Sequence, residues 1–180
     1  MLKTLTVALP GSPGELIRIT ELPALVADRY ARTALAAADL PTDGGVVSLA
    51  LTHMPAILAL GESAIPLLEP FVQADRSVRG WRDVLALQQA ALMLHVGFLI
   101  NRPRVDIPVT MLAEAALRGP SDVAVHFCSP AIATVLHSGR ATYRELETVL
   151  STEDAYNLAE LVNVEAIREW HAHQSKSAHT

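Results

Sequence analysis

The start of the chain changes from a strand-like to a helix-like spacing of apolar residues. Residues 2–9 and 15–20 each alternate apolar and polar positions, with Ile17 and Ile19 on the apolar side of the second run. Between these runs, residues 10–14 read PGSPG, a composition typical of turns. The pattern predicts a β-hairpin with a slightly long loop. An isolated hairpin is marginally stable in water, so we expect this one to pack on the rest of the protein or on a partner.

An amphipathic helix is predicted directly after the hairpin. Pro23 is tolerated in a first helical turn, and the residues that follow place an apolar stripe beside a charged one. The helix should end near Asp39, where loop-forming residues begin. The free edges of the hairpin could accept a strand, and together with this helix they form the surface that we expect to bind a protein partner. The residues predicted to contact the partner are Ile17, Ile19, Leu22, Leu25, Val26 and Arg29.

Helical spacing continues through the middle of the chain. A helix is predicted over 46–60, kinked or divided at Pro55, and short helical pieces interrupted by prolines follow over 62–74. The strongest helix covers 81–100 and is apolar on nearly every side, which is typical of the centre of a bundle. Three further helices are expected, from Asp106 to Leu117, over 121–128 and over 129–138.

Local capping signals define the last helices. Gly139 is well placed to end the preceding helix in a left-handed conformation. Thr142-Tyr-Arg-Glu145 and Ser151-Thr-Glu-Asp154 both have the spacing of a capping box, and they predict helices over 143–150 and from 152 to about 171. The apolar stripe of the last helix consists of Ala155, Ala159, Val162, Ala166 and Trp170, widened by Leu158 and Leu161.

These elements predict a mainly α protein, a helical bundle with a small N-terminal β-hairpin. The expected divisions are a hairpin over 1–22 packed on the body, a helical body over 23–140, a C-terminal helical hairpin over 141–173 and a mobile tail over 174–180. A chain of 180 residues that is 51% hydrophobic can bury one core, so we expect a single domain. Abundant alanine and only 4% aromatic residues favour helices that pack closely.

Charge and composition narrow the class of partner. The net charge is −5 and Lys and Arg are spread thinly, so nucleic acid is not an expected partner. The longest apolar run, 84–100, contains polar residues and is marginal against the ~20 residues that span a bilayer, which indicates a buried helix rather than a membrane span. Cys128 is the single cysteine, and Pro10 interrupts the N-terminus before a signal peptide could form. Both features favour a cytoplasmic protein.

The residues capable of chemistry do not form a recognisable catalytic or metal site, and we expect neither an enzyme nor a cofactor. His171 and His173 would point to different sides of a helix, as expected for a solvated helix end. His95 could titrate beside a carboxylate, but a core histidine with one hydrogen bond is the favoured interpretation. Cys128 and His126 would form a dyad only if they met in space, and an inert buried cysteine is favoured.

Two segments resemble a known family. The segment Ile19-Thr-Glu-Leu22, followed by PALVADRYARTAL over 23–35, resembles the N-terminal region of tail assembly chaperones of long-tailed bacteriophages, the family of the phage lambda G protein. The likeness covers about the first quarter of the chain and rests on its hydrophobic pattern. The segment from Tyr143 to Trp170 resembles C-terminal helices of phage tail proteins.

The resemblance implies a non-enzymatic helical protein of the host cytoplasm. Such a protein binds the tape measure protein, keeps the long hydrophobic helices of that protein soluble and recruits tail tube subunits. The resemblance leaves open whether the chain forms a homo-oligomer. Two other classes of protein stay open. One is a structural head-tail or tail-completion protein that remains in the virion. The other is a small helical enzyme or metal protein, which would require His95, His126 and Cys128 to converge.

Overall fold

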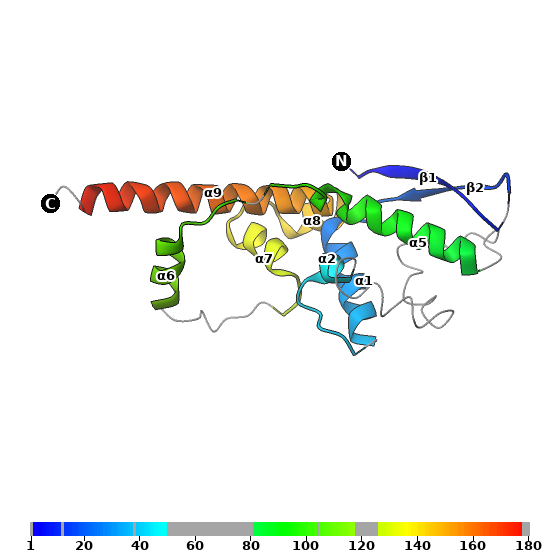
Figure 1. Ribbon diagram of the computed structural model, residues 1–180, viewed down its shortest axis with the longest axis horizontal. Coiled ribbons are helices and arrows are strands. Elements are labelled where there is room, and N and C mark those ends of the chain that lie inside the picture. The colour runs from blue at the N-terminus through cyan, green and yellow to red at the C-terminus, as the bar shows by residue number, and fades with distance from the viewer. Residues whose placement is uncertain are drawn as a thin grey trace.

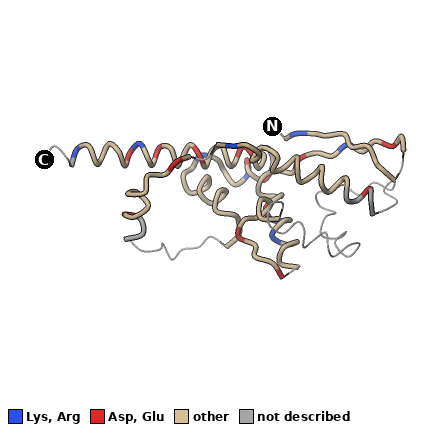
Figure 2. The backbone as a smooth tube through the Cα atoms, in the orientation of Figure 1, with Lys and Arg blue, Asp and Glu red and all other residues tan. Residues whose placement is uncertain are grey.

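A computed structural model describes residues 2–11, 13–37, 39–49, 81–103, 105–117 and 126–177. Over these ranges the protein is mainly α with a two-stranded antiparallel hairpin at its N-terminus, which confirms the predicted fold class (Figure 1). Charged residues of both signs are spread along the chain rather than gathered in one region (Figure 2). The helices predicted over 62–74, and most of the one predicted over 46–60, lie outside the described residues.

The hairpin forms where the alternating pattern predicts it. Strand β1 (Thr4–Ala8) pairs with β2 (Leu16–Thr20), and Val7 lies opposite Ile17. Ile17 and Ile19 are buried, whereas Leu5, on the same side of the sheet, remains 41% exposed. Strand β2 therefore lies over the core, and β1 is covered less completely.

Helix α5 (Trp81–Val96) holds the hairpin at two points. Near its N-terminal end, the buried carboxylate of Asp83 accepts a hydrogen bond from the backbone N–H of Gly11 at 2.6 Å. Near its C-terminal end, Nε2 of His95 accepts a hydrogen bond from the N–H of Leu22 at 2.9 Å. Asp83 and His95 are about 18 Å apart along a helix, similar to the length of a short strand. The hairpin is therefore fixed along the helix at both its loop and its base.

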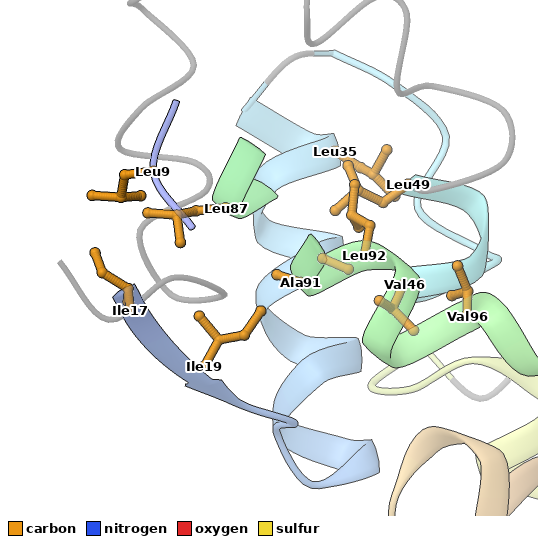
Figure 3. Packing of buried hydrophobic residues seen from close by; sticks show 11 residues of the cluster. Leu9, Ile17, Ile19, Leu35, Val46, Leu49, Leu87, Ala91, Leu92 and Val96 are labelled. Atoms are coloured by element: carbon orange, nitrogen blue, oxygen red, sulfur yellow. The ribbon is translucent and has the colours of Figure 1, made fainter. Parts of the chain in front are cut away.

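A first apolar cluster fills the space between the hairpin and the helices around it. Helices α1 (Ala24–Ala37), α2 (Gly45–Ser48) and α5 all contribute to it. In Figure 3, Leu9 and Ile17 of the hairpin lie beside Leu87, while Leu35 and Leu49 gather around Leu92. Its remaining buried members are Ile19, Ala31, Val46, Ala91 and Val96.

A second apolar cluster lies on another side of α1. Here Ala24 and Leu25 pack with α7 (Pro130–His137), α8 (Tyr143–Thr148) and α9 (Thr152–Ser177). Helix α8 packs mainly on α1, whereas α9 packs mainly on α7 and also contacts α1 and α5. Helix α1 therefore contributes to both clusters and joins the two parts of the core. The other buried members of this cluster are Cys128, Ile132, Val135, Ala141, Leu146, Ala155 and Ala159.

The predicted caps of the C-terminal helices are confirmed. Thr142 and Glu145 form a reciprocal capping box at the start of α8. Ser151 and Asp154 form the same arrangement at the start of α9. Gly139 follows α7 with a φ of 68°, the left-handed conformation that a glycine adopts without strain.

Several predicted helix boundaries are wrong. Helix α6 (Val109–Leu117) begins after Pro108 rather than at Asp106, because the residue before a proline is disfavoured in a helix. Residues 126–128, predicted as the end of a helix, are not helical. Helix α8 ends at Thr148 rather than residue 150, and the short helix η3 (Gly97–Leu99) follows α5.

Helix α9 continues to Ser177, so residues 174–177 of the predicted mobile tail are helical. No glycine or proline occurs within the helix to end it sooner. Leu161, expected on its buried stripe, is exposed. Farther along, the Trp170 indole N–H donates to Glu114 of α6 at 2.9 Å, and the Gln174 amide donates to the same carboxylate at 2.8 Å. These two bonds hold α6 beside the distal part of α9 (Figure 1).

The environment of His95 makes stability depend on pH. Burial lowers the pKa of His95, and the charge of Lys3 lowers it further, against the opposing effect of the hydrogen bond to the Ala91 carbonyl. The unfolded chain therefore takes up this proton at a higher pH than the folded protein. We expect His95 to lower the free energy of unfolding by up to about 1.4 kcal/mol per pH unit as pH falls below about 6.5.

Urea unfolding of the wild type and of His95→Gln between about pH 7.5 and pH 5.5 gives the free energy of unfolding at each pH. The contribution of His95 is the difference between the slopes of this free energy against pH for the two proteins. His137→Gln, which removes an exposed histidine from α7, is the matched control. Equal slopes in the wild type and His95→Gln would contradict the prediction.

Candidate functional site

A cleft of about 550 Å³ lies between the segment 99–107, of which residues 99–103 and 105–107 are described, and helices α7 and α9. This volume falls within the ~300–1,000 Å³ typical of binding pockets. Its walls are mostly aliphatic, and proline rings at Pro103 and Pro130 add apolar surface without N–H groups. The aliphatic lining residues are Val47, Leu99, Val105, Ile107, Ala131 and Ala159.

The charged side of the cleft carries an ion pair. Nε of Arg102 donates to Oε2 of Glu160 at 3.1 Å, and both side chains line the cleft. The Arg102 guanidinium also lies 5.5 Å from the centre of the Phe98 ring, which makes an edge-to-face contact with Tyr156. These contacts hold Arg102 in place and balance its charge locally. The cleft is therefore suited to a neutral, apolar ligand more than to a phosphate or a carboxylate.

The remaining polar groups of the cleft are neutral at physiological pH. Burial raises the pKa of Tyr156, and the negative charge of Asp28 raises it further. The phenol therefore keeps its proton and stays a hydrogen-bond donor. The amide of Asn163 lines the cleft from the exposed side of α9. Together these two groups could meet the polar atoms of a peptide while the walls cover its apolar side chains.

The carboxylate of Asp28 fixes the start of α7, which forms one wall of the cleft. Asp28 is buried, and its Oδ2 accepts a hydrogen bond from the N–H of Ser129 at 3.1 Å. Among the described residues, its Oδ1 has no hydrogen-bond partner and faces Gly45. Burial raises the pKa of Asp28, against the opposing effects of its hydrogen bonds to Ser129 and the charge of Arg32.

Arg32, one turn after Asp28, fixes the loops on either side of α1. Its guanidinium donates to the carbonyl of Thr42 at 3.1 Å and to the carbonyl of His126 at 2.6 Å. The chain between His126 and Ser129, which is not helical, is therefore held at both ends by α1. Through these contacts α1 determines where α7 begins.

Cys128, His126 and His95 lack the features of a catalytic group. Burial and the nearby negative charge of Asp28 raise the pKa of Cys128 to about 11, so the thiol is protonated at neutral pH and is a poor nucleophile. The side chain of His126 is exposed while Cys128 is buried. In His95, Nδ1 donates to the Ala91 carbonyl at 2.7 Å and Nε2 accepts from Leu22, so both ring nitrogens have structural roles.

No three His, Cys, Asp or Glu side chains within the described ranges are placed to hold a metal ion. His171 and His173 are exposed on the distal part of α9. None of the described helices combines the length and apolar character that crossing a bilayer requires.

The residues predicted to contact a partner occupy different environments. Ile17 and Ile19 are buried in the first apolar cluster and Leu25 in the second, so these three side chains are core residues rather than a surface. Alternation shows that residues share a side of an element, but it does not show whether that side is already covered within the chain.

The other predicted contact residues are more accessible. Leu22 and Val26 are half-buried. Arg29 is exposed and donates hydrogen bonds to the Tyr143 hydroxyl at 3.0 Å and to Glu147 at 3.1 Å. The structure therefore does not assemble the predicted residues into one apolar surface.

Sequence reasoning missed the cleft residues. The walls of the cleft come from segments that are distant in the chain, and the helical pattern alone does not place the segment 99–107 against α7 and α9. The available signal was the aliphatic pair Val105 and Ile107, which lies between Pro103 and Pro108 in the sequence, where apolar side chains need a covering surface.

Searches of protein families, curated proteins and solved structures find no match to this chain. Function must therefore be inferred from the site.

The close approach of the Asp28 carboxylate to Gly45 predicts that alanine at position 45 lowers the free energy of unfolding more than alanine at position 139 does. Gly45 has a φ of 54°, and a Cβ there would approach Oδ1 of Asp28 to 1.9 Å. Gly139 has a φ of 68° and no heavy atom within 4 Å of such a Cβ. Gly139→Ala should therefore lower the free energy of unfolding by about 1 kcal/mol through backbone strain alone.

Gly45→Ala should cost about 1–3 kcal/mol more than Gly139→Ala, because the Asp28 carboxylate must move. Urea unfolding of both variants at neutral pH measures the difference. An equal loss of stability would show that Asp28 is free to move away from Gly45.

Proposed function

We propose that this chain binds an apolar helical segment of a protein partner in the cleft between 99–107, α7 and α9. The observation that carries the proposal is that the cleft has mainly apolar walls and lies close in the chain to large exposed apolar residues. Val109, on the helix that follows the segment 99–107, is 80% exposed. Ile100, Leu112 and Leu161 are also exposed.

An amphipathic helix suits such a cleft. Its apolar side chains at i, i+3 and i+4 would enter the space between α7 and the segment 99–107, while its polar side stays in water. Arg102 and Glu160 already neutralise each other, so the partner need not supply a compensating charge. Ile100, which adjoins the lining residue Leu99 in the chain, is exposed and would extend the contact beyond the cleft itself.

The partner that we propose is the tape measure protein of a long-tailed phage. The resemblance to tail assembly chaperones supports this partner, because the long apolar helices of a tape measure protein must be shielded from water before the tail assembles. The chain would act in the bacterial cytoplasm without catalysing a reaction, and it would help to recruit tail tube subunits. An open cleft with a neutral lining fits a binding partner that must later be released.

Filling the cleft should weaken this binding. Asn163 lines the cleft from the exposed side of α9, whereas Asn157 is exposed on the same helix and does not line it. We expect Asn163→Trp to weaken binding of the tape measure protein at least tenfold, about 1.4 kcal/mol, because the indole occupies the cleft. Asn157→Trp is the matched control and should bind like the wild type.

The measurement is co-expression with the tape measure protein, followed by the soluble yield of that protein and its affinity for each purified variant. Equal affinity of Asn163→Trp and Asn157→Trp would rule out the cleft as the binding site. A tape measure protein that stays equally soluble without this chain would rule out the chaperone function.

The protein content of the virion distinguishes a chaperone from a structural protein of the head or tail. A chaperone leaves the assembly, so mass spectrometry of purified virions should detect tail tube and tape measure peptides but not this chain. Detection in stoichiometric amounts would instead show that the chain is a structural component.

A further inference from the structure

The outer edge of β1 has hydrogen-bonding groups that the hairpin does not use. The N–H of Glu21 donates to the carbonyl of Lys3 at 2.8 Å, and the N–H of Leu9 donates to the carbonyl of Glu15 at 3.2 Å. In an antiparallel pair, residues bonded to the partner strand alternate with residues whose N–H and C=O point the other way. The backbone groups of Thr4, Thr6 and Ala8 therefore point away from β2.

The described part of the chain leaves this edge uncovered. The main contacts of β1 are with β2 and α5, and the side chains of Thr4, Thr6 and Ala8 are exposed. Val7 is half-buried and Leu5 is 41% exposed, although their neighbours Ile17 and Ile19 on β2 are buried. An added strand beside β1 would bond the free backbone groups and also cover Leu5.

The edge of β1 also lacks the features that prevent strands from pairing. Its sequence, TLTVA, contains no charge and no proline, and it forms regular pairs with β2 without a bulge. The opposite edge of the hairpin, on β2, carries Arg18 and is protected by its charge. Strand pairing is therefore expected at β1 rather than at β2.

We propose that β1 pairs antiparallel with β1 of a second copy of this chain, about a two-fold axis at Thr6. This register places Thr6 opposite Thr6 of the second copy and Thr4 opposite Ala8 of the second copy, and each pair exchanges both N–H···O=C bonds. Leu5 then lies opposite Val7 of the second copy, so the half-exposed apolar side chains of each hairpin cover those of the other.

The composition of the edge favours a second copy as the occupant. Two identical charged strands would repel each other, but β1 carries no charge, so the two-fold arrangement brings no like charges face to face. Lys3, which precedes the strand, is paired with Glu153. A five-residue strand edge is small against the ~1,200 Å² buried by stable complexes, so the dimer should form in a concentration-dependent way.

Proline substitutions at two paired positions test the edge. Thr6 and Arg18 lie opposite each other, and neither uses its N–H in the β1–β2 ladder. Thr6→Pro therefore removes a donor only from the β1 edge, and Arg18→Pro removes one only from the β2 edge. Sedimentation equilibrium of the full chain from micromolar to near-millimolar concentration gives the mass of each variant.

We expect the wild type and Arg18→Pro to dimerise with similar dissociation constants, and Thr6→Pro to dimerise at least tenfold more weakly. A wild type that stays monomeric over the whole range would overturn the proposal. So would a dimer that Thr6→Pro leaves unchanged or that Arg18→Pro weakens equally.

Opposite charges at Thr6 provide a second test that does not depend on proline. The side chain of Thr6 is exposed and would meet its own copy at the two-fold axis. Thr6→Lys alone and Thr6→Glu alone should each stay monomeric, whereas an equimolar mixture of the two should form a dimer. A mixture that stays monomeric, while the wild type dimerises, would place the dimer contact elsewhere.

Partner binding in the cleft is tested with Asn163→Trp, and dimerisation through β1 is tested with the variants of Thr6 and Arg18. The two measurements are separate, so either proposal can fail without the other.

Discussion

The structure depends on the burial of one helix, α1, on more than one side. Ala27 and Ala31 have no exposed surface and Ala34 almost none, so neighbouring elements approach the helix closely along its length. Larger side chains at the same positions would separate the hairpin and α5 on one side from α7, α8 and α9 on the other. Since α1 also carries Asp28 and Arg32, the same helix packs the core and determines where the cleft wall begins.

Buried polar groups set the positions of the elements that apolar packing leaves free to slide. Aliphatic surfaces fit one another in several registers, but a buried carboxylate or imidazole nitrogen that lacks a hydrogen-bond donor is costly. Asp83 and His95 each accept one backbone N–H from the hairpin, and Asp28 accepts one from the start of α7. These bonds define one register for the hairpin on α5 and one starting point for α7.

The features that could be predicted from the sequence are local ones. The capping boxes at Thr142 and Ser151 and the left-handed glycine at Gly139 depend on residues within one turn, and each is found where the pattern indicated. The hairpin and the mainly helical class followed from periodicity for the same reason. The surroundings of Ile17, Ile19 and Leu25 depend on contacts with distant segments, and their burial in the core could not be separated from a partner surface by pattern alone. The cleft required the placement of 99–107 against α9, which no local signal specifies.

The length of α9 affects how the size of this protein is measured. At about 1.5 Å per residue, a helix of 26 residues is about 39 Å long, and Figure 1 shows its C-terminal end projecting beyond α6 and the other elements. Such a shape raises the frictional drag on the molecule above that of a compact sphere of 19.3 kDa. A monomer would therefore elute early from a sizing column and resemble a larger species, so only methods that report mass directly can distinguish shape from association.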